Sequence, residues 1–218
     1  MSYGFAIEIR GDYACFSRPE LKVERVSYEV MTPSAARGIL EAVFWKPEIR
    51  YVIDEIAVCA PIKMENIRRN EVNSKISYSS TDNAMKRLAE NSLWLNASGD
   101  RAQRAAIVLR DVCYVVKAHF ELTGKAEPVS EDISGKYAAI IRRRLEKGQC
   151  FHMPYLGCRE FPAQISLAED YEPIQESRSL GLMFYDFEYA NPGEFIPTYF
   201  MAELKDGVID VSGAEVLR

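Results

Sequence analysis

The chain has 218 residues, of which 48% are hydrophobic and 27% are charged, a composition typical of a globular protein with a sizeable core. It contains no apolar run long enough to span a bilayer and no basic-then-apolar signal segment at its start. The formal net charge of −5 argues against a simple binder of polyanions. We therefore expect a cytoplasmic protein of one large domain, or of one domain with a small appendage, and no membrane partner.

The charge is unevenly distributed along the chain. Residues 1–159 hold 24 Lys and Arg against 20 Asp and Glu, whereas residues 160–218 hold 3 against 12. This asymmetry predicts a basic face in the first part and an acidic module in the second. The five Cys are odd in number and form no Cys-x-x-Cys pair, and the two His lie far apart in sequence. We expect reduced thiols, no metal site and no cofactor.

Hydrophobic periodicity gives the expected elements in chain order. Thr32 and Pro33 suit the N-cap and first residue of a helix, Gly148 suits a helix C-cap, and Asp206-Gly207 is a hairpin turn signal. The expected elements are strand 3–17, helix 34–45, strand 50–64, a short helix 82–90 within a polar excursion, strand 104–122, helix 130–147, and short strands 183–189, 199–205 and 208–211.

This order of strands and helices matches the βαββαβ arrangement of ferredoxin-like domains. We expect an α+β protein with a ferredoxin-like, RRM-like domain in residues 1–150. A small antiparallel β-sheet domain is expected in residues 151–218. In such a fold two helices cover one face of the sheet, and the other face is open to a ligand or to a second module. Fold alone does not establish function.

The strand over residues 112–121 carries the most informative pattern. Its side chains alternate between two faces, and one face is apolar: Tyr114, Val116, Ala118 and Phe120. The other face ends with Lys117, His119 and Glu121. Lys117 and His119 are expected side by side, about 7 Å apart at Cα, which places a group that titrates near neutral pH next to a fixed positive charge. A hydrogen-bonded structural His is the alternative interpretation of these residues alone.

Two clusters of arginine are candidates for contact with a nucleic acid backbone. Arg68 and Arg69 follow the second long strand and suit a phosphate contact, although a solvated hairpin tip is the other interpretation of this segment. Arg142 and Arg143 stand mostly on the exposed side of the helix 130–147. Three consecutive arginines on a helix cannot all face one ligand, so one or two at most can touch a backbone.

Six segments resemble a known family in the same order and across nearly the whole chain. They are residues 10–16, 31–41, 44–47, 67–71, 116–120 and 155–160. The chain resembles the type I-C (Dvulg subtype) CRISPR-associated protein of Cas family five. The resemblance implies a ferredoxin-like domain with a small C-terminal β-sheet domain. It also implies that the protein cleaves the CRISPR precursor transcript and then holds the 5′ handle of the guide with the other subunits of the interference complex.

The reaction implied by the resemblance is metal-independent RNA cleavage, in which the 2′-hydroxyl attacks the neighbouring phosphate and leaves a 2′,3′-cyclic phosphate. Such chemistry needs a base, an acid and stabilisation of the charged phosphorane. The resemblance places the catalytic Lys and His at Lys117 and His119, with His119 as general base or acid and Lys117 facing the phosphorane. The family's Tyr before Trp-Lys-Pro is Phe44 here, which has no hydroxyl and which the helix pattern assigns to the core.

Two other functions stay open at this point. The first is a non-catalytic scaffold that binds the crRNA handle and caps a guide-bearing complex. The second is binding of double-stranded DNA inside that complex, which predicts a salt-sensitive affinity without base preference. Cleavage in the presence of a chelator, with the chemistry of the product ends, separates the enzyme from the scaffold.

Overall fold

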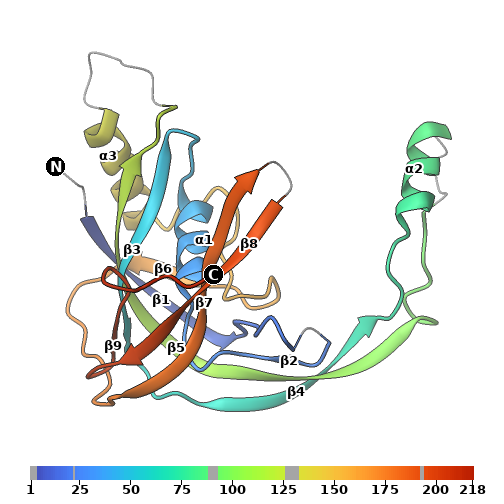
Figure 1. Ribbon diagram of the computed structural model, residues 1–218, viewed down its shortest axis with the longest axis horizontal. Coiled ribbons are helices and arrows are strands. Elements are labelled where there is room, and N and C mark those ends of the chain that lie inside the picture. The colour runs from blue at the N-terminus through green and yellow to red at the C-terminus, as the bar shows by residue number, and fades with distance from the viewer. Residues whose placement is uncertain (1–3, 22, 88–92, 126–132, 192–193) are drawn as a thin grey trace. The chain divides into compact units, whose positions relative to one another are not determined.

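The computed structural model describes residues 4–21, 23–87, 93–125, 133–191 and 194–218 (Figure 1). It confirms a protein of mixed α and β structure in which the strand pairings are antiparallel. The strands are β1 (Gly4–Ala14), β2 (Arg25–Val26), β3 (Ile49–Val58), β4 (Met64–Val72), β5 (Arg101–Leu122), β6 (Gln164–Leu167), β7 (Arg178–Asn191), β8 (Glu194–Leu204) and β9 (Val208–Asp210). The helices are α1 (Pro33–Val43), α2 (Tyr78–Arg87) and α3 (Ile133–Glu146).

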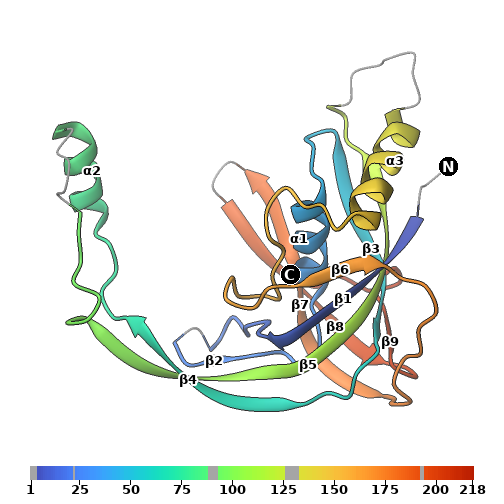
Figure 2. The ribbon, with the colours of Figure 1, turned by 180° about the vertical axis from the view of Figure 1, so that it is seen from behind.

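One seven-stranded sheet has the order β6-β1-β5-β3-β9, with β2 and β4 also pairing with β5 (Figure 2). The strands β7 and β8 form a separate two-stranded sheet. By its contacts the chain divides into two compact units. The larger unit comprises Met1–Glu65 and Ile107–Arg218, and the smaller unit comprises Asn66–Ala106. The domain boundary expected at residue 150 stays a prediction.

Helices α1 and α3 pack against one another on one face of the sheet in the larger unit (Figures 1 and 2). The expected cap is confirmed, because the Thr32 side chain accepts a hydrogen bond from the Ala35 amide and Pro33 opens the helix. The apolar stripe of α1 is buried, as are the residues of β5 predicted for the core face: Tyr114, Val116, Ala118 and Phe120. The Tyr51 hydroxyl donates to the carbonyl of Phe44 at 2.7 Å and so links β3 to the end of α1.

Several sequence-based boundaries and orientations need correction. Residues 64–72 form strand β4 rather than a hairpin tip, because β5 extends back to Arg101 and pairs with them. The helix expected at 82–90 runs from Tyr78 to Arg87, and residues 88–92 lie outside the described residues. Met85 on this helix is 72% exposed.

The segment after α3 departs from the expectation of one small sheet. The turn at Asp206-Gly207 is confirmed, and both residues have positive φ angles. The strand that follows this turn, β9, pairs with β3 of the large sheet, however, and only β7 and β8 stay separate. β7 contacts α1 through an ion pair in which Arg37 binds both carboxylate oxygens of Asp186, at 2.6 and 2.8 Å. The C-terminal strands are therefore part of the same compact unit as the catalytic candidates.

Candidate functional site

Three charged or titratable side chains project in a row from the end of β5, each paired with a partner on β3. Nδ1 of His119 lies 2.9 Å from Oδ2 of Asp54. Nζ of Lys117 lies 2.7 Å from Oε2 of Glu55, and Glu121 is held at 2.7 Å by Arg50. The row stands on the face opposite the buried Tyr114–Phe120 series, as the alternation predicted. The structure therefore brings Lys117 and His119 together on the face that the helices leave uncovered.

A β-bulge in β3 explains why both carboxylates reach this row. Ile53 pairs with Ala118, but the next residue pair in the register is Glu55 with Lys117, so Asp54 is an extra residue in β3. Without the bulge, Asp54 and Glu55 would point to opposite faces of the sheet. The extra residue is fixed from the far side, because the Asp54 carbonyl accepts hydrogen bonds from the amides of Val211 and Ser212 at 2.9 and 3.0 Å.

On the other side of β5, strand β1 places small residues beside the row. Gly4 pairs with His119 and Ala6 pairs with Lys117. A Cβ added at Gly4 would meet only the Ala118 carbonyl, at 3.9 Å. The side chains of Lys117 and His119 are 46% and 23% exposed. Gly4 and Ala6 therefore place no bulky side chain of β1 beside these two groups.

The electrostatics of the row keep Lys117 charged. The hydrogen bond to Glu55 raises the pKa of Lys117 above its ordinary value, with smaller contributions from Tyr171. The pKa of Glu121 is lowered, chiefly by its hydrogen bond to Arg50. An ammonium and an imidazole then stand next to each other, each held by an acidic group. This is the arrangement that stabilisation of a phosphorane and transfer of a proton require.

Asp54 also determines which nitrogen of His119 is available. An ionised carboxylate only accepts hydrogen bonds, so the proton of the neutral imidazole must lie on Nδ1, facing Asp54. Nε2 is then left with its lone pair for a substrate. The pairing gives His119 a defined tautomer and ring orientation, as the carboxylate does in acid-base catalysis by His and Asp.

The position of Phe44 differs from that of Lys117 and His119. Phe44 ends α1 and is 5% exposed. Its ring lies 5.5 Å from that of Tyr137 of α3, and the Arg144 guanidinium lies over it at 5.3 Å. Since Tyr51, which binds the Phe44 carbonyl, shares its face with Phe120, Phe44 belongs to the helix-covered face. It does not join the row of His119.

The two arginine clusters belong to different compact units of the chain. Arg68 and Arg69 belong to the smaller unit and alternate on β4, so Arg68 is exposed while Arg69 is 17% exposed and lies 3.7 Å from Glu71. They point to opposite faces and cannot grip one phosphate together. In the larger unit, Arg142 lines a hollow of about 310 Å³ with Gly4, the register partner of His119. Arg143 is exposed on α3.

Two residues of the row escaped sequence reasoning. Regular alternation along the predicted strand 50–64 places Asp54 and Glu55 on opposite faces, whereas both face the row. The available signal was an adjacent pair of acidic residues inside a strand that is otherwise apolar, because a buried carboxylate on a core face is costly unless it is paired. A bulge resolves this conflict, but only the register reveals it.

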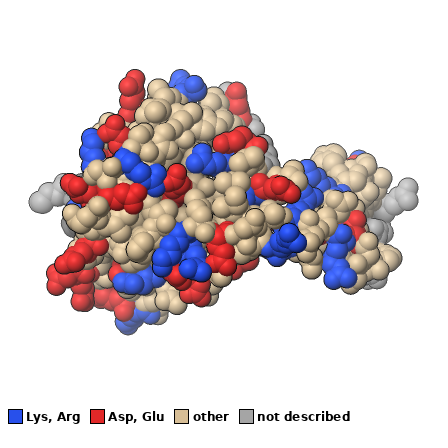
Figure 3. All heavy atoms as spheres, turned by 90° about the horizontal axis from the view of Figure 1, so that it is seen from below, with Lys and Arg blue, Asp and Glu red and all other residues tan. Residues whose placement is uncertain are grey.

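In the described part of the chain, no group of three or more His, Cys, Asp or Glu is placed to hold a metal ion. Nor is any of its helices long and apolar enough to cross a membrane. On the face in Figure 3, Lys and Arg stand interspersed with Asp and Glu instead of merging into one basic patch.

Comparison with known proteins places the chain in a family. The sequence profile of the CRISPR-associated protein Cas5 family matches residues 4–212. A protein of Mannheimia succiniciproducens, named CRISPR pre-crRNA endoribonuclease Cas5d, is 50% identical, covering 97% of this chain and 96% of its own length. A protein of the same name from Thermus thermophilus is 39% identical, covering 94% of this chain and 90% of its own length.

Solved structures show the same fold at low sequence identity. The crystal structure of a CRISPR-associated protein has a TM-score of 0.72 at 23% identity, covering 100% of this chain and 97% of its own. A functionally uncharacterized protein from Streptococcus mutans has a TM-score of 0.69 at 24% identity, covering 100% and 98%. A chain of a CRISPR RNA-guided surveillance complex has a TM-score of 0.51 at 10% identity, covering 99% and 89%. With the profile and the two close relatives, the chain belongs to the Cas5 family of CRISPR-associated proteins, in its Cas5d branch.

Proposed function

We propose that the chain is a metal-independent endoribonuclease that cleaves CRISPR repeat RNA and then retains the 5′ handle of the guide within a type I-C interference complex. The observation that carries this proposal is the row on β5 and β3, in which His119 is held by Asp54 and Lys117 by Glu55. The names of the two close relatives support the RNA substrate and the cleavage.

The larger unit supports a ferredoxin-like arrangement for the RNA-binding domain. Its strands β1, β3, β5 and β6, with α1 and α3 between them, follow the order βαββαβ. Their sheet order, β6-β1-β5-β3 with antiparallel neighbours, is the one that two interleaved split βαβ units produce. The uncovered face of this sheet carries Lys117 and His119, and RNA-recognition domains bind their ligand on the corresponding face.

In the proposed reaction His119 exchanges one proton through Nε2, either taking it from the 2′-hydroxyl or giving it to the leaving 5′-oxygen, and solvent water carries the other proton. The 2′-oxygen forms a bond to phosphorus, and the bond from phosphorus to the 5′-oxygen breaks. The products are a 2′,3′-cyclic phosphate and a 5′-hydroxyl. Lys117 stands beside His119 to offset the charge on the equatorial oxygens of the phosphorane. Asp54 positions the imidazole through its Nδ1.

The test is cleavage of the host repeat RNA in excess EDTA by wild type, His119→Ala and Lys117→Ala. Loss of an acid-base group lowers the rate by about 10²–10⁴-fold, and tight RNA binding should persist in both variants. Lys205→Ala is a matched control, because Lys205 is an exposed lysine that lies 3.0 Å from Glu203 on β8. A product that ends in a cyclic phosphate is expected. Cleavage that stops in EDTA would contradict the metal-independent reaction.

The scaffold remains the second candidate because Phe44 supplies no hydroxyl where the resemblance expects Tyr. In that case the chain would hold the handle and contact neighbouring subunits without cutting the RNA. Tight binding of repeat RNA by wild type and by His119→Ala, with cleavage by neither, would establish the scaffold and reject the enzyme.

A further inference from the structure

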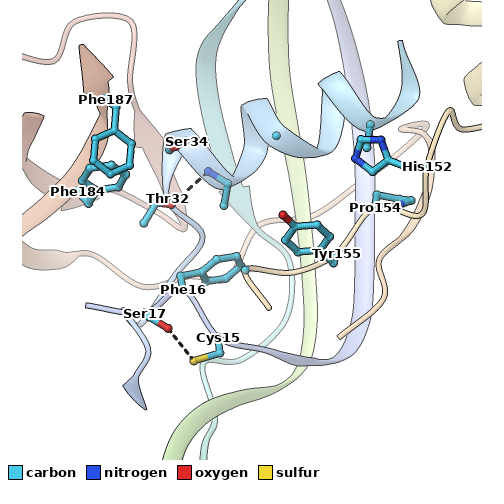
Figure 4. A pocket seen from close by; sticks show the side chains of 14 residues that line it. Cys15, Phe16, Ser17, Thr32, Ser34, His152, Pro154, Tyr155, Phe184 and Phe187 are labelled. Atoms are coloured by element: carbon cyan, nitrogen blue, oxygen red, sulfur yellow. Dashed lines mark hydrogen bonds between the residues drawn. The ribbon is translucent and has the colours of Figure 1, made fainter. Parts of the chain in front are cut away.

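A cavity of about 450 Å³ lies in the larger unit (Figure 4), and neither Lys117 nor His119 is among the residues that line it. Cys15 lines the cavity, and the residue before it, Ala14 of β1, pairs with Leu109 of β5. At the other end of β1, Gly4 pairs with His119. Ten residues of β5 separate these two pairings, which corresponds to roughly 30 Å along the strand. The cavity is therefore a separate site from the proposed cleavage centre.

Aromatic rings form much of the wall of this cavity. Phe16 comes from the end of β1, Tyr155 from the loop after α3, and Phe184 and Phe187 from β7. The rings of Phe184 and Phe187 lie 4.9 Å apart and form one side. Figure 4 shows the Tyr155 hydroxyl turned toward α1 across the cavity. Base stacking on aromatic side chains is the common way in which proteins hold unpaired nucleotides.

Gly38, an exposed glycine, leaves the α1 side of the cavity open. It lies inside α1 and lines the cavity, yet a Cβ added there would meet no atom within 4 Å. A glycine inside a helix destabilises it by about 0.5–1 kcal/mol relative to alanine. The packing of the chain itself gives no reason for this glycine. A molecule that approaches the helix backbone closely would give one.

The polar groups at the cavity suit the edge of a base. His152 and Tyr155 both line it, and in the described portion of the chain their side chains have no hydrogen-bond partner. The volume lies within the range of about 300–1,000 Å³ typical of small-ligand sites. Three of the six segments that carry the family resemblance, residues 10–16, 31–41 and 155–160, meet at this cavity.

We infer that this cavity takes one unpaired nucleotide of the RNA, with its base between the aromatic wall and the helix at Gly38. The inference rests on the proposed RNA function and adds to it a second contact, remote from the cleaved bond. Such a contact fixes the register of the RNA, because one extruded base sets the position of every nucleotide between the cavity and His119.

The test measures binding of repeat RNAs that each carry one abasic site at an unpaired position, with His119→Ala protein so that the RNA stays intact. One abasic position should weaken binding about 5- to 100-fold, the range for the loss of one stacked base. Gly38→Leu in the same protein should weaken binding of intact RNA by a similar factor and abolish the effect of that abasic site. Gly38→Ala should have a smaller effect and should not lower the melting temperature.

Control variants distinguish failure of this inference from failure of the proposed RNA function. Glu146→Leu adds an apolar side chain at an exposed position of α3 and should leave both measurements unchanged. If Gly38→Leu does not fold, Phe187→Ala and Tyr155→Phe provide the same comparison. If folded Gly38→Leu still loses affinity at the same abasic position as the starting protein, the inference is overturned. It is also overturned if Gly38→Leu binds RNA normally but no longer binds a protein partner. If the starting protein fails to bind repeat RNA, the proposed function itself fails.

Discussion

Asp54 lies opposite Lys117 as an extra residue of β3, and its carboxylate oxygen is 2.9 Å from Nδ1 of His119. In a regular strand Asp54 would pair with Lys117 and face the row alone, so the extra residue is what brings Glu55 to the same face. One irregularity in the backbone thus gives Lys117 and His119 each a carboxylate partner on the neighbouring strand.

The first prediction concerns Asp54. In Asp54→Asn the amide group can donate to Nδ1, which favours the tautomer that has its proton on Nε2. We expect the cleavage rate at saturating RNA to fall by about 10- to 100-fold, less than for removal of the acid-base group itself, with little change in RNA affinity. Single-turnover kinetics and a binding titration separate the two quantities. An equal loss of affinity would indicate that Asp54 supports the fold instead of His119.

The charge of Lys117 gives the second prediction. Because Glu55 raises the pKa of Lys117, this ammonium stays protonated across neutral and mildly alkaline pH, and the stability from the pair is lost only as the pH rises through that raised pKa. Cleavage should therefore show no fall from deprotonation of Lys117 between about pH 7 and 9.5. Lys117→Arg should keep much of the activity, whereas Lys117→Met should lose it. Equal activities of these two variants would show that the charge is not needed.

The third prediction restores the hydroxyl that the resemblance expects. Phe44→Tyr adds a polar group at a position that is 5% exposed, between Tyr137 and Arg144 on the helix side. We expect no increase in cleavage and a loss of about 1–3 kcal/mol if the hydroxyl finds no partner. The measurements are cleavage rate and chemical denaturation, with Phe44→Leu as the control for packing. Faster cleavage would mean that this side chain reaches the RNA.

The arginines of β4 are expected to have different roles. Arg68 is exposed, whereas Arg69 is largely buried beside Glu71. Arg68→Ala should weaken RNA binding and reduce the salt dependence by about one counterion, without lowering stability. Arg69→Ala should destabilise the protein instead. A salt titration of binding and a melting curve for each variant would test this, and the reverse pattern would contradict the assignment.

The ion pair between α1 and β7 is the fifth case. Arg37 binds both carboxylate oxygens of Asp186, and the two side chains are 19% and 22% exposed. Arg37→Met should destabilise the protein by about 1–3 kcal/mol, since a charge-assisted pair is lost and a half-buried carboxylate remains. The double variant with Asp186→Leu should regain part of this energy. Additive losses in chemical denaturation would show that the two residues do not act as a pair.

Much of the larger unit could be predicted from the sequence, because its elements obey simple periodicities. The alternation along β5 correctly separated the buried Tyr114 and Val116 from the exposed Lys117. The cap at Thr32 and the turn at Asp206-Gly207 depend on local chemistry and were predicted for that reason. Local signals of this kind survive folding, since the side chains act within a few residues of their own backbone.

What could not be predicted depends on contacts between distant segments. The bulge at Asp54 is visible only in the register with β5, and the pairing of β9 with β3 places a strand from the far end of the sequence on the large sheet. Residues 64–72 read as polar and mixed in charge, but β5 extends far enough to pair with them. Pairing with β5 therefore makes residues 64–72 a strand despite their low intrinsic strand propensity.

The hydrogen bonds from Val211 and Ser212 to the Asp54 carbonyl have a consequence for the order of assembly. During synthesis, β1, β3, β5 and both helices of the larger unit leave the ribosome well before β9 does. A nascent chain can then build its RNA-facing sheet while the backbone at Asp54 is still unsecured. We expect the ability to hold RNA to precede the ability to cut it, since the segment that secures the Asp54 backbone follows the strands of the sheet in the chain.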